Sequence, residues 1–214
     1  MSVICPTVLA QELHEYREQM ERLGPFAQRI HIDLADGEFT PTKTVPIDSL
    51  WWPRNVGIDM HVMYQRPAEI IDQLIALRPN MVIMHAQAEG NFIEMANKLH
   101  AEQIKVGVAL LPRTAPEVIE PAAHAIDHVL IFSGDLGSFG GTADLSQLQK
   151  VSHIRKLKHD VEIGWDGGVN ADNAAVLMAG GIDVLNVGGA IQKAAQPAAA
   201  YAKLLAAIEK KHDT

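Results

Sequence analysis

Histidine and aspartate residues stand at the ends of short apolar segments, in an arrangement that could bind a metal ion. HIDLADGEF carries His31 and Asp33, DMHVM carries Asp59 and His61, and GWDGGV carries Asp166. Mixed imidazole nitrogens and carboxylate oxygens suit zinc, manganese, iron or cobalt better than calcium. Each of these residues alone is more often a cap of a neighbouring loop or helix. Two imidazoles and two carboxylates that converge from three segment ends favour a divalent-metal site.

Three pairs of neighbouring glycines follow later segments of the chain and could bind phosphate. They are Gly140–Gly141, Gly167–Gly168 and Gly188–Gly189, the last of which precedes a predicted short helix. Glycines let backbone N–H groups approach an oxyanion closely. One pair usually marks only a turn. Three pairs in consecutive loops favour a phosphate site.

Repeated strand and helix patterns must position these groups. Short apolar runs predict strands over Ser2–Leu9, Gln28–Leu34, Val56–Val62, Asn80–His85, Lys105–Leu110, His128–Phe132, Val161–Asp166 and Val184–Val187. Amphipathic stretches between and after them predict helices over Gln11–Leu23, Pro67–Leu77, Asn91–Gln103, Ala115–Ala123, Ser146–Lys158, Ala171–Ala179 and Pro197–Lys210. This alternation predicts a parallel sheet. Eight repeats in 214 residues favour a closed (β/α)8 (TIM) barrel, with residues 1–214 as one domain. An open doubly wound sheet is the alternative.

The barrel explains how residues distant in sequence could form one site. Chemistry in such barrels lies at the C-terminal ends of the strands. Residues two apart on a strand share a face, so His31 and Asp33 are expected to point into the interior together. We therefore expect the histidines and aspartates to meet at one mouth of the barrel.

Composition limits the partners of the chain. A formal net charge of −8 argues against nucleic acid or an anionic membrane as the main partner. Cys5 is the single cysteine, which fits a reducing compartment and predicts a cytoplasmic protein. The first residues lack the basic flank of a signal peptide, and no apolar run reaches transmembrane length. A small anionic substrate is still compatible, because backbone N–H groups can hold phosphate locally.

Eight motifs in order along nearly the whole chain resemble the ribulose-phosphate 3-epimerase family. They are PTVL, HIDLADGEFTP, DMHVM followed by RP, MHAQAEG, VGVAL with TAPE, SFGG, DGGVNADN and NVGGAI. The resemblance implies that His31, Asp33, His61 and Asp166 bind one divalent metal ion. It also implies that Asp33 and Asp166 are the acid–base pair that converts D-ribulose 5-phosphate to D-xylulose 5-phosphate. Two carboxylates on opposite sides of a substrate suit this reaction, since one can remove a proton and the other return one.

The same resemblance implies the remaining site residues and the assembly. Thr7 and Met63 would lie beside the substrate, and the substrate phosphate would lie against Gly140, Gly141, Gly168, Gly188 and Gly189. His85 matches a family histidine, which we expect to be structural. A homo-oligomer, either a dimer or a hexamer, is implied as well.

The chain departs from the family pattern near the expected substrate. Ala35 and Ser133 stand where the family pattern has methionines, and the loop from Ser133 to Gly141 has no proline. Smaller side chains would widen the pocket and loosen its lid, so a different ketose phosphate, such as a hexulose 6-phosphate, is an alternative substrate. A sugar-phosphate-binding protein with little turnover is a second alternative.

A decarboxylase related to the orotidine-phosphate and ketogulonate-phosphate enzymes is disfavoured. Those enzymes carry a lysine within an Asp-x-Lys-x-x-Asp motif, and that lysine protonates a carbanion. The corresponding stretch here runs from Asp33 through Leu-Ala to Asp36 and contains no lysine.

Overall fold

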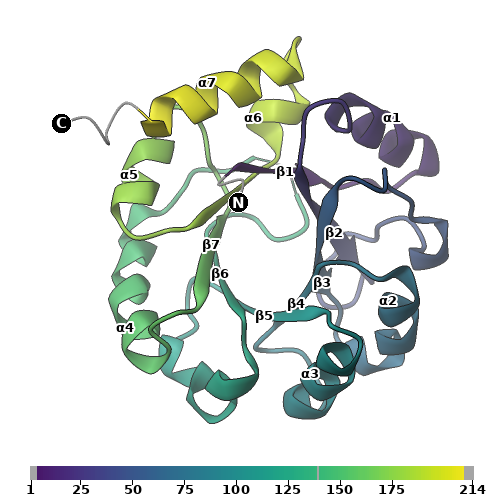
Figure 1. Cartoon of the computed structure of the whole chain (residues 1–214), viewed down its shortest axis with the longest axis vertical. Helices are drawn as coiled ribbons and strands as arrows, with labels where there is room; N and C mark the ends of the chain where they lie inside the picture. The colour runs from purple at the N-terminus through teal and green to yellow at the C-terminus, as the bar shows by residue number, and fades with distance from the viewer. Residues whose placement is uncertain (1–3, 139, 210–214) are drawn as a thin grey trace.

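A closed barrel of eight parallel strands forms the centre of the molecule (Figure 1). The computed structural model describes residues 4–138 and 140–209. The strands are β1 (Ile4–Val8), β2 (Arg29–Ala35), β3 (Gly57–Met63), β4 (Met81–His85), β5 (Lys105–Leu110), β6 (His128–Phe132), β7 (Glu162–Asp166) and β8 (Val184–Val187). Each strand pairs with the next in sequence, and β8 pairs with β1. The predicted closed barrel is confirmed and the open sheet is wrong.

The strands are apolar because both of their faces are buried. All five residues of β4, MVIMH, and of β6, HVLIF, are buried. Outward residues pack under the surrounding helices, as expected for a parallel sheet covered on its outside. Inward residues Met81, Ile83, Ala109 and Leu130 form a separate apolar cluster inside the barrel. The interior of the barrel is therefore packed with side chains and is not an open pore.

Helices surround the strands in Figure 1. They are α1 (Leu13–Leu23), α2 (Ile71–Leu77), α3 (Phe92–Ala101), α4 (Gln149–Leu157), α5 (Ala174–Ala179), α6 (Gly189–Gln192) and α7 (Pro197–Glu209). Short 3-10 segments are η1 (Ile47–Ser49), η2 (Pro67–Glu69), η3 (Pro116–Ala125) and η4 (Leu145–Leu148). Within the described ranges, no helix is long and apolar enough to cross a membrane.

The predicted strands agree with the structure, but three predicted helices are wholly or partly 3-10 segments. The predicted helix Pro67–Leu77 begins with η2, and the predicted helix Ser146–Lys158 begins within η4. The stretch Ala115–Ala123 was expected to be an amphipathic helix but forms the 3-10 segment η3, which contains Pro121. Proline has no N–H, and its ring clashes with the preceding turn of an α-helix. At the two ends of the chain, Ser2 of the first predicted strand and Lys210 of the last predicted helix lie outside the described residues.

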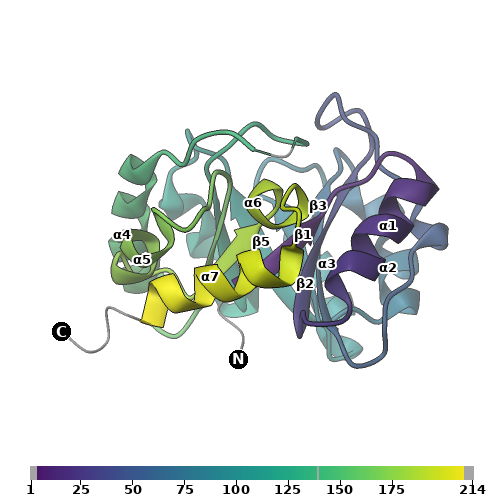
Figure 2. The ribbon, with the colours of Figure 1, turned by 90° about the horizontal axis from the view of Figure 1, so that it is seen from above.

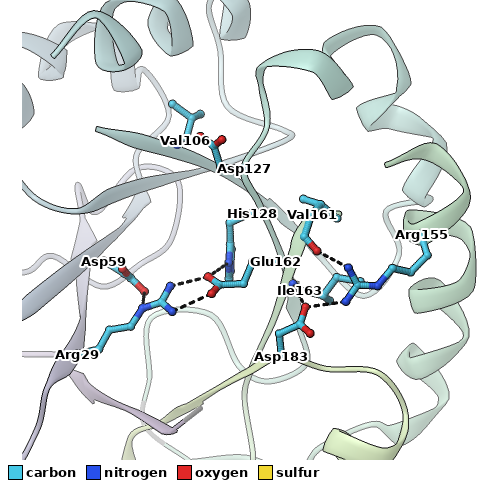
Figure 3. A network of polar contacts seen from close by, with 10 residues as sticks. All are labelled: Arg29, Asp59, Val106, Asp127, His128, Arg155, Val161, Glu162, Ile163 and Asp183. Atoms are coloured by element: carbon cyan, nitrogen blue, oxygen red, sulfur yellow. Dashed lines mark hydrogen bonds and ion pairs between the residues drawn. The ribbon is translucent and has the colours of Figure 1, made fainter. Parts of the chain in front are cut away.

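A network of charged side chains closes the N-terminal end of the barrel (Figure 3). Arg29, the first residue of β2, lies 2.6 Å from Asp59 and 2.6 Å from Glu162. The ring of His128 lies 2.9 Å from Glu162. Asp59, expected beside His61 at a strand end, therefore belongs to the opposite end of the barrel. Residues two apart on a strand share a face but lie at different heights along the barrel axis. Asp59 lies nearer to the N-terminal end of the barrel than His61.

Candidate active site

Two histidines and two aspartates meet at the C-terminal end of the barrel. His31 and Asp33 come from β2, His61 from β3 and Asp166 from β7, and one potential ligand atom of each lies within 4.8 Å of the others. Asp33 is the register neighbour of His61, and their Oδ1 and Nδ1 atoms are 2.8 Å apart. The structure thus brings together the four residues that the family resemblance implied. Asp59 is not among them.

The donor atoms of this cluster suit a divalent ion. His31 is fully buried, and its ring nitrogens have no hydrogen-bond partner within the described part of the chain. Its Nε2 lies 3.3 Å from Asp33 and 3.7 Å from Asp166. An imidazole nitrogen without a hydrogen bond, aimed at two carboxylates, is an arrangement that a metal ion would complete. Nitrogen and oxygen donors together favour a transition metal.

The two carboxylates have opposite pKa shifts. Burial raises the pKa of Asp33, but the imidazoles of His31 and His61 outweigh burial and lower it below its ordinary value. Burial and the neighbouring charge of Asp33 raise the pKa of Asp166 to about 6. One carboxylate is therefore ionised throughout the neutral range, while the other can hold a proton near neutrality. Such a divergence is typical of acid–base pairs in active sites.

His85 at the end of β4 supports the cluster from the side. Its Nε2 lies 2.8 Å from Nε2 of His61, and its ring packs 4.7 Å from the ring of Phe39. Burial, followed by the charge of His61, lowers the pKa of His85 well below its ordinary value. A neutral His85 can accept the Nε2–H of His61 and leave the Nδ1 of His61 directed at Asp33. His85 thus contacts a member of the four-residue cluster without belonging to it.

A cavity of about 240 Å³ opens beside Asp33 and Asp166. Its walls include every residue that the resemblance placed beside the substrate or its phosphate, namely Thr7, Met63, Gly140, Gly141, Gly168, Gly188 and Gly189. These residues come from β1, β3 and the loops after β6, β7 and β8. Their roles in binding remain predictions.

The loops after β6, β7 and β8 approach one another closely at glycine residues. Gly168 has a φ of +68°, and a side chain there would collide with the backbone of Ala143 at 2.2 Å. A Cβ atom on Gly189 would lie 3.8 Å from the backbone nitrogen of Gly140. Glycine is therefore required sterically at Gly168. The close approach leaves the backbone amides of these loops beside the cavity, where an anion could meet them.

The cavity wall after β6 differs from the expectation. Ser133 was expected to replace a family methionine and widen the pocket. Phe132 lines the cavity instead, with its ring 6.3 Å from that of His61. Ser133 follows the strand, and its hydroxyl accepts the N–H of Asp144 at 2.7 Å. The predicted opening at Ser133 is wrong, because strand alternation directs Phe132 into the barrel.

The expected widening of the pocket at Ala35 stays a prediction, because Ala35 is not among the residues that line the cavity. Ala35 is buried at the end of β2 on the same strand face as His31 and Asp33. The carboxylate of Asp36, the following residue, accepts hydrogen bonds from the backbone N–H groups of Glu38, Phe39 and Gln65. Asp36 therefore connects the loop after β2 with the loop after β3.

Several further side chains on the cavity wall were missed from the sequence, and three of them bear on the chemistry of the site. Phe132, Asn186 and Lys193 all line it. Asn186 could have been noticed as the single polar residue of the strand VLNV. Lys193 follows the short helix α6, and no pattern in the sequence marked it as a site residue.

The comparison with known proteins identifies the family. A model described as the ribulose-phosphate 3 epimerase family matches residues 3–192. The chain belongs to the ribulose-phosphate 3-epimerase family. Membership confirms the expected enzyme class, an isomerase that acts on carbohydrates.

Relatives of this family align over nearly their whole length. A ribulose-phosphate 3-epimerase of Schizosaccharomyces pombe is 26% identical, over 99% of this chain and 96% of its own. One from Mycobacterium leprae is 29% identical, over 94% of this chain and 93% of its own. Among solved structures, 3-hexulose-6-phosphate synthase from Salmonella typhimurium superposes with a TM-score of 0.71 at 14% identity, over 98% of this chain and 99% of its own. That similarity shows the barrel fold alone.

Proposed function

We propose that this chain is a metal-dependent 3-epimerase that converts D-ribulose 5-phosphate to D-xylulose 5-phosphate. The observation that carries the proposal is the pairing of Asp33 and Asp166, two carboxylates with opposite pKa shifts, beside a glycine-lined cavity. Family membership and the names of the aligned relatives support the choice of substrate.

Epimerisation requires proton transfer on both faces of carbon three. One carboxylate removes the proton from one face, and the other returns a proton to the opposite face. Asp33, with its lowered pKa, is held as a carboxylate by the imidazoles. Asp166, with its pKa raised to about 6, can carry the transferred proton in the neutral range. The pair can exchange roles for the reverse reaction.

His31, Asp33, His61 and Asp166 would hold the divalent ion, whether zinc, manganese, iron or cobalt. When bound, the ion would supply Lewis-acid polarisation of the ketone, which makes the neighbouring C–H more acidic. His85 would fix the ring of His61 for this task through the contact between their Nε2 atoms.

The glycine loops would hold the phosphate, as the resemblance implies. Gly140, Gly141, Gly168, Gly188 and Gly189 would present backbone N–H groups to its oxygens. Thr7 and Met63 would contact the sugar. The ring of Phe132 takes up space on the side of the cavity that was expected to be open, which favours the pentulose over a larger ketose.

Incorporation of solvent deuterium tests the reaction directly. Enzyme reconstituted with each metal in turn is incubated in D2O with D-ribulose 5-phosphate and, in parallel, with a hexulose 6-phosphate. We expect deuterium at carbon three together with D-xylulose 5-phosphate. Asp33→Asn and Asp166→Asn should each abolish the formation of D-xylulose 5-phosphate, since either loss leaves one face without its proton carrier. The variant that keeps the carboxylate facing the C3 hydrogen of D-ribulose 5-phosphate can still exchange that hydrogen for deuterium.

Other outcomes separate the alternatives. Faster exchange with the hexulose phosphate would change the substrate but keep the reaction. A metal-loaded protein that binds ketose phosphates without any exchange would contradict catalysis and identify a binding protein.

Assembly and location are part of the proposal. We infer a cytoplasmic homo-oligomer, a dimer or a hexamer, from the family resemblance and the single cysteine. Light scattering after size-exclusion chromatography measures the number of subunits, and the mass of one chain would contradict the oligomer.

A further inference from the structure

A buried polar atom on the cavity wall has no use in the fold. Asn186 is the third residue of β8 and is only 2% exposed. Its Oδ1 has no hydrogen-bond partner within the described part of the chain. Burial of a hydrogen-bond acceptor costs free energy when the acceptor loses its contacts with water and gains no partner in the protein. An apolar side chain at this position would give a more stable barrel.

The side chain of Asn186 faces the reaction site. Its strand neighbours Leu185 and Val187 belong to the main hydrophobic core, and alternation directs Asn186 to the interior. Its register partner on β7 is Asp166. Asn186 also lines the cavity that contains Asp33 and Asp166. Asn186 therefore lies on the cavity wall, on the strand next to that of a proposed acid–base residue.

Thr7 on the adjoining strand β1 shows the same property. It is 2% exposed, and its Oγ1 also lacks a hydrogen-bond partner among the described residues. It lines the same cavity as Asn186. Two unpaired polar atoms on adjacent strands leave a polar patch where the barrel closes between β8 and β1. A bound molecule with hydroxyl groups would pair with both.

We propose that Asn186 determines specificity by accepting a hydrogen bond from a hydroxyl group of the ketose chain. This inference rests on the proposed epimerase function. An amide oxygen accepts and cannot donate, and a fully ionised phosphate also has only acceptors. Asn186 Oδ1 can therefore accept from a hydroxyl group of the sugar but not from the ionised phosphate, which only the Nδ2 donors of the amide could contact. A site that hydrogen-bonds a hydroxyl rejects analogues that lack it.

The test replaces the amide by an apolar group of similar size, Asn186→Leu. Calorimetry measures the binding of D-ribulose 5-phosphate and, separately, of inorganic phosphate. We expect affinity and kcat/KM for D-ribulose 5-phosphate to fall roughly tenfold to hundredfold. Affinity for inorganic phosphate should be unchanged. The melting temperature should not fall, because the substitution removes an unpaired buried acceptor.

Two further variants keep the result interpretable. If Asn186→Leu does not fold, the same measurements are made on Asn186→Ala, whose smaller side chain cannot clash with its neighbours. Asn80→Leu is the matched control, because Asn80 Oδ1 accepts the N–H of Ile58 at 2.8 Å near the start of β4. That variant should lower the melting temperature and leave binding unchanged.

Unchanged affinity for D-ribulose 5-phosphate in a folded Asn186 variant would overturn the inference. An equal loss of affinity for inorganic phosphate would also overturn it, because the amide would then contact the phosphate. A wild-type protein that binds the ketose phosphate without turning it over would refute the epimerase proposal alone, and the two affinities would still decide the role of Asn186. A wild-type protein that does not bind it would refute both.

Discussion

At the scale of single residues, unequal distances separate the roles of the two carboxylates. The Nδ1 of His61 lies 2.8 Å from Asp33 but 3.8 Å from Asp166. The Nε2 of His31 is likewise nearer to Asp33, at 3.3 Å against 3.7 Å. Because both imidazoles are nearer to Asp33, its negative charge is stabilised. Asp166 experiences mainly burial and the charge of Asp33, which raise its pKa to about 6.

Metal binding should depend on pH through these groups. Ligands must lose their protons before they bind a metal, so protons compete with the ion. The pKa of His31 is raised above its ordinary value of about 6.5. Metal affinity should therefore begin to fall as pH drops through that range, and it should fall more steeply below about 6, where Asp166 also takes up a proton. We expect roughly a tenfold loss of affinity per pH unit for each displaced proton. Calorimetric titration with zinc, manganese and cobalt at several pH values measures this slope, and a constant affinity would contradict it.

His85 should tune metal affinity without binding the ion. Groups that orient a ligating histidine typically contribute 10–100-fold to metal affinity. His85→Phe keeps the packing on Phe39 but removes the nitrogen that faces His61. We expect affinity to fall about tenfold or more in this variant. His85→Gln, which retains an acceptor, should recover most of it.

Metal titrations of these variants distinguish positioning from packing. A purely structural His85 would give variants with lowered melting temperatures and wild-type metal affinity. That result would contradict the positioning role.

At the scale of elements, the segment after β6 lies across the mouth of the barrel. Figure 2 shows it above the strands at the upper edge of the molecule. Two threonines after β2 hold it in place: Thr40 donates to the carbonyl of Leu136 at 3.0 Å, and Thr42 donates to that of Gly137 at 2.7 Å. Loops that close over a site exclude water and position the substrate. Side chains from the loop after β2 thus anchor the segment after β6 at Leu136 and Gly137.

Loosening this segment should weaken substrate binding. Replacing both threonines, Thr40→Val and Thr42→Val, removes two hydrogen bonds that each contribute about 1 kcal/mol. We expect KM for D-ribulose 5-phosphate to rise roughly threefold to tenfold, with a smaller change in melting temperature. Ser152→Ala is the control, since its hydroxyl bonds only Gln149 within α4. An unchanged KM in the double variant would show that the segment does not contribute to binding.

At the scale of the whole molecule, charge is divided between the two ends of the barrel. The C-terminal end holds the four metal-ligand candidates, and the N-terminal end holds Arg29, Asp59, His128 and Glu162. Burial raises the pKa of Glu162, but His128 and Arg29 outweigh it and lower that pKa below its ordinary value. Asp59 differs, because burial outweighs Arg29 and raises its pKa. Glu162 is thus the acid of this network that stabilises the fold through its charge.

Stability should therefore depend on the ionisation of Glu162. Its lowered pKa in the folded state contributes stability above the unfolded value of about 4.3, and that contribution is lost as pH falls below it. Glu162→Gln should cost about 1–3 kcal/mol at neutral pH. The difference from wild type should shrink as pH falls below about 4.3, because Glu162 is then increasingly protonated in the unfolded state while it stays ionised in the folded state.

Thermal melts across this pH range measure the effect. Glu102→Gln is the matched control, an acid near the same end of the barrel that is exposed and makes no ion pair among the described contacts. A difference between wild type and Glu162→Gln that does not change with pH would contradict an electrostatic role.

The sequence by itself determined the barrel, and its resemblance to the family implied the four residues of the metal-ligand cluster. Strand and helix patterns repeat eight times, and a two-residue period places His31 and Asp33 on one face. These are local properties, because each depends on neighbours along the chain. Pro121 shows the limit, since the amphipathic pattern of its segment did not reveal that the turns would be 3-10 rather than α-helical.

Only the tertiary structure decided which polar residues share an end and what each contacts. The two-residue period of a strand predicts the face that a side chain occupies but not its height along the barrel axis. It could not distinguish the end to which Asp59 belongs from that of His61, and the contact between Arg29 and Asp59 did so. Ser133 and Phe132 differ by one residue, and the register of β6 selected Phe132 for the wall. The opposite pKa shifts of Asp33 and Asp166 depend on burial and on distances across strands. Contacts between segments distant in sequence set these properties, and no local pattern encodes them.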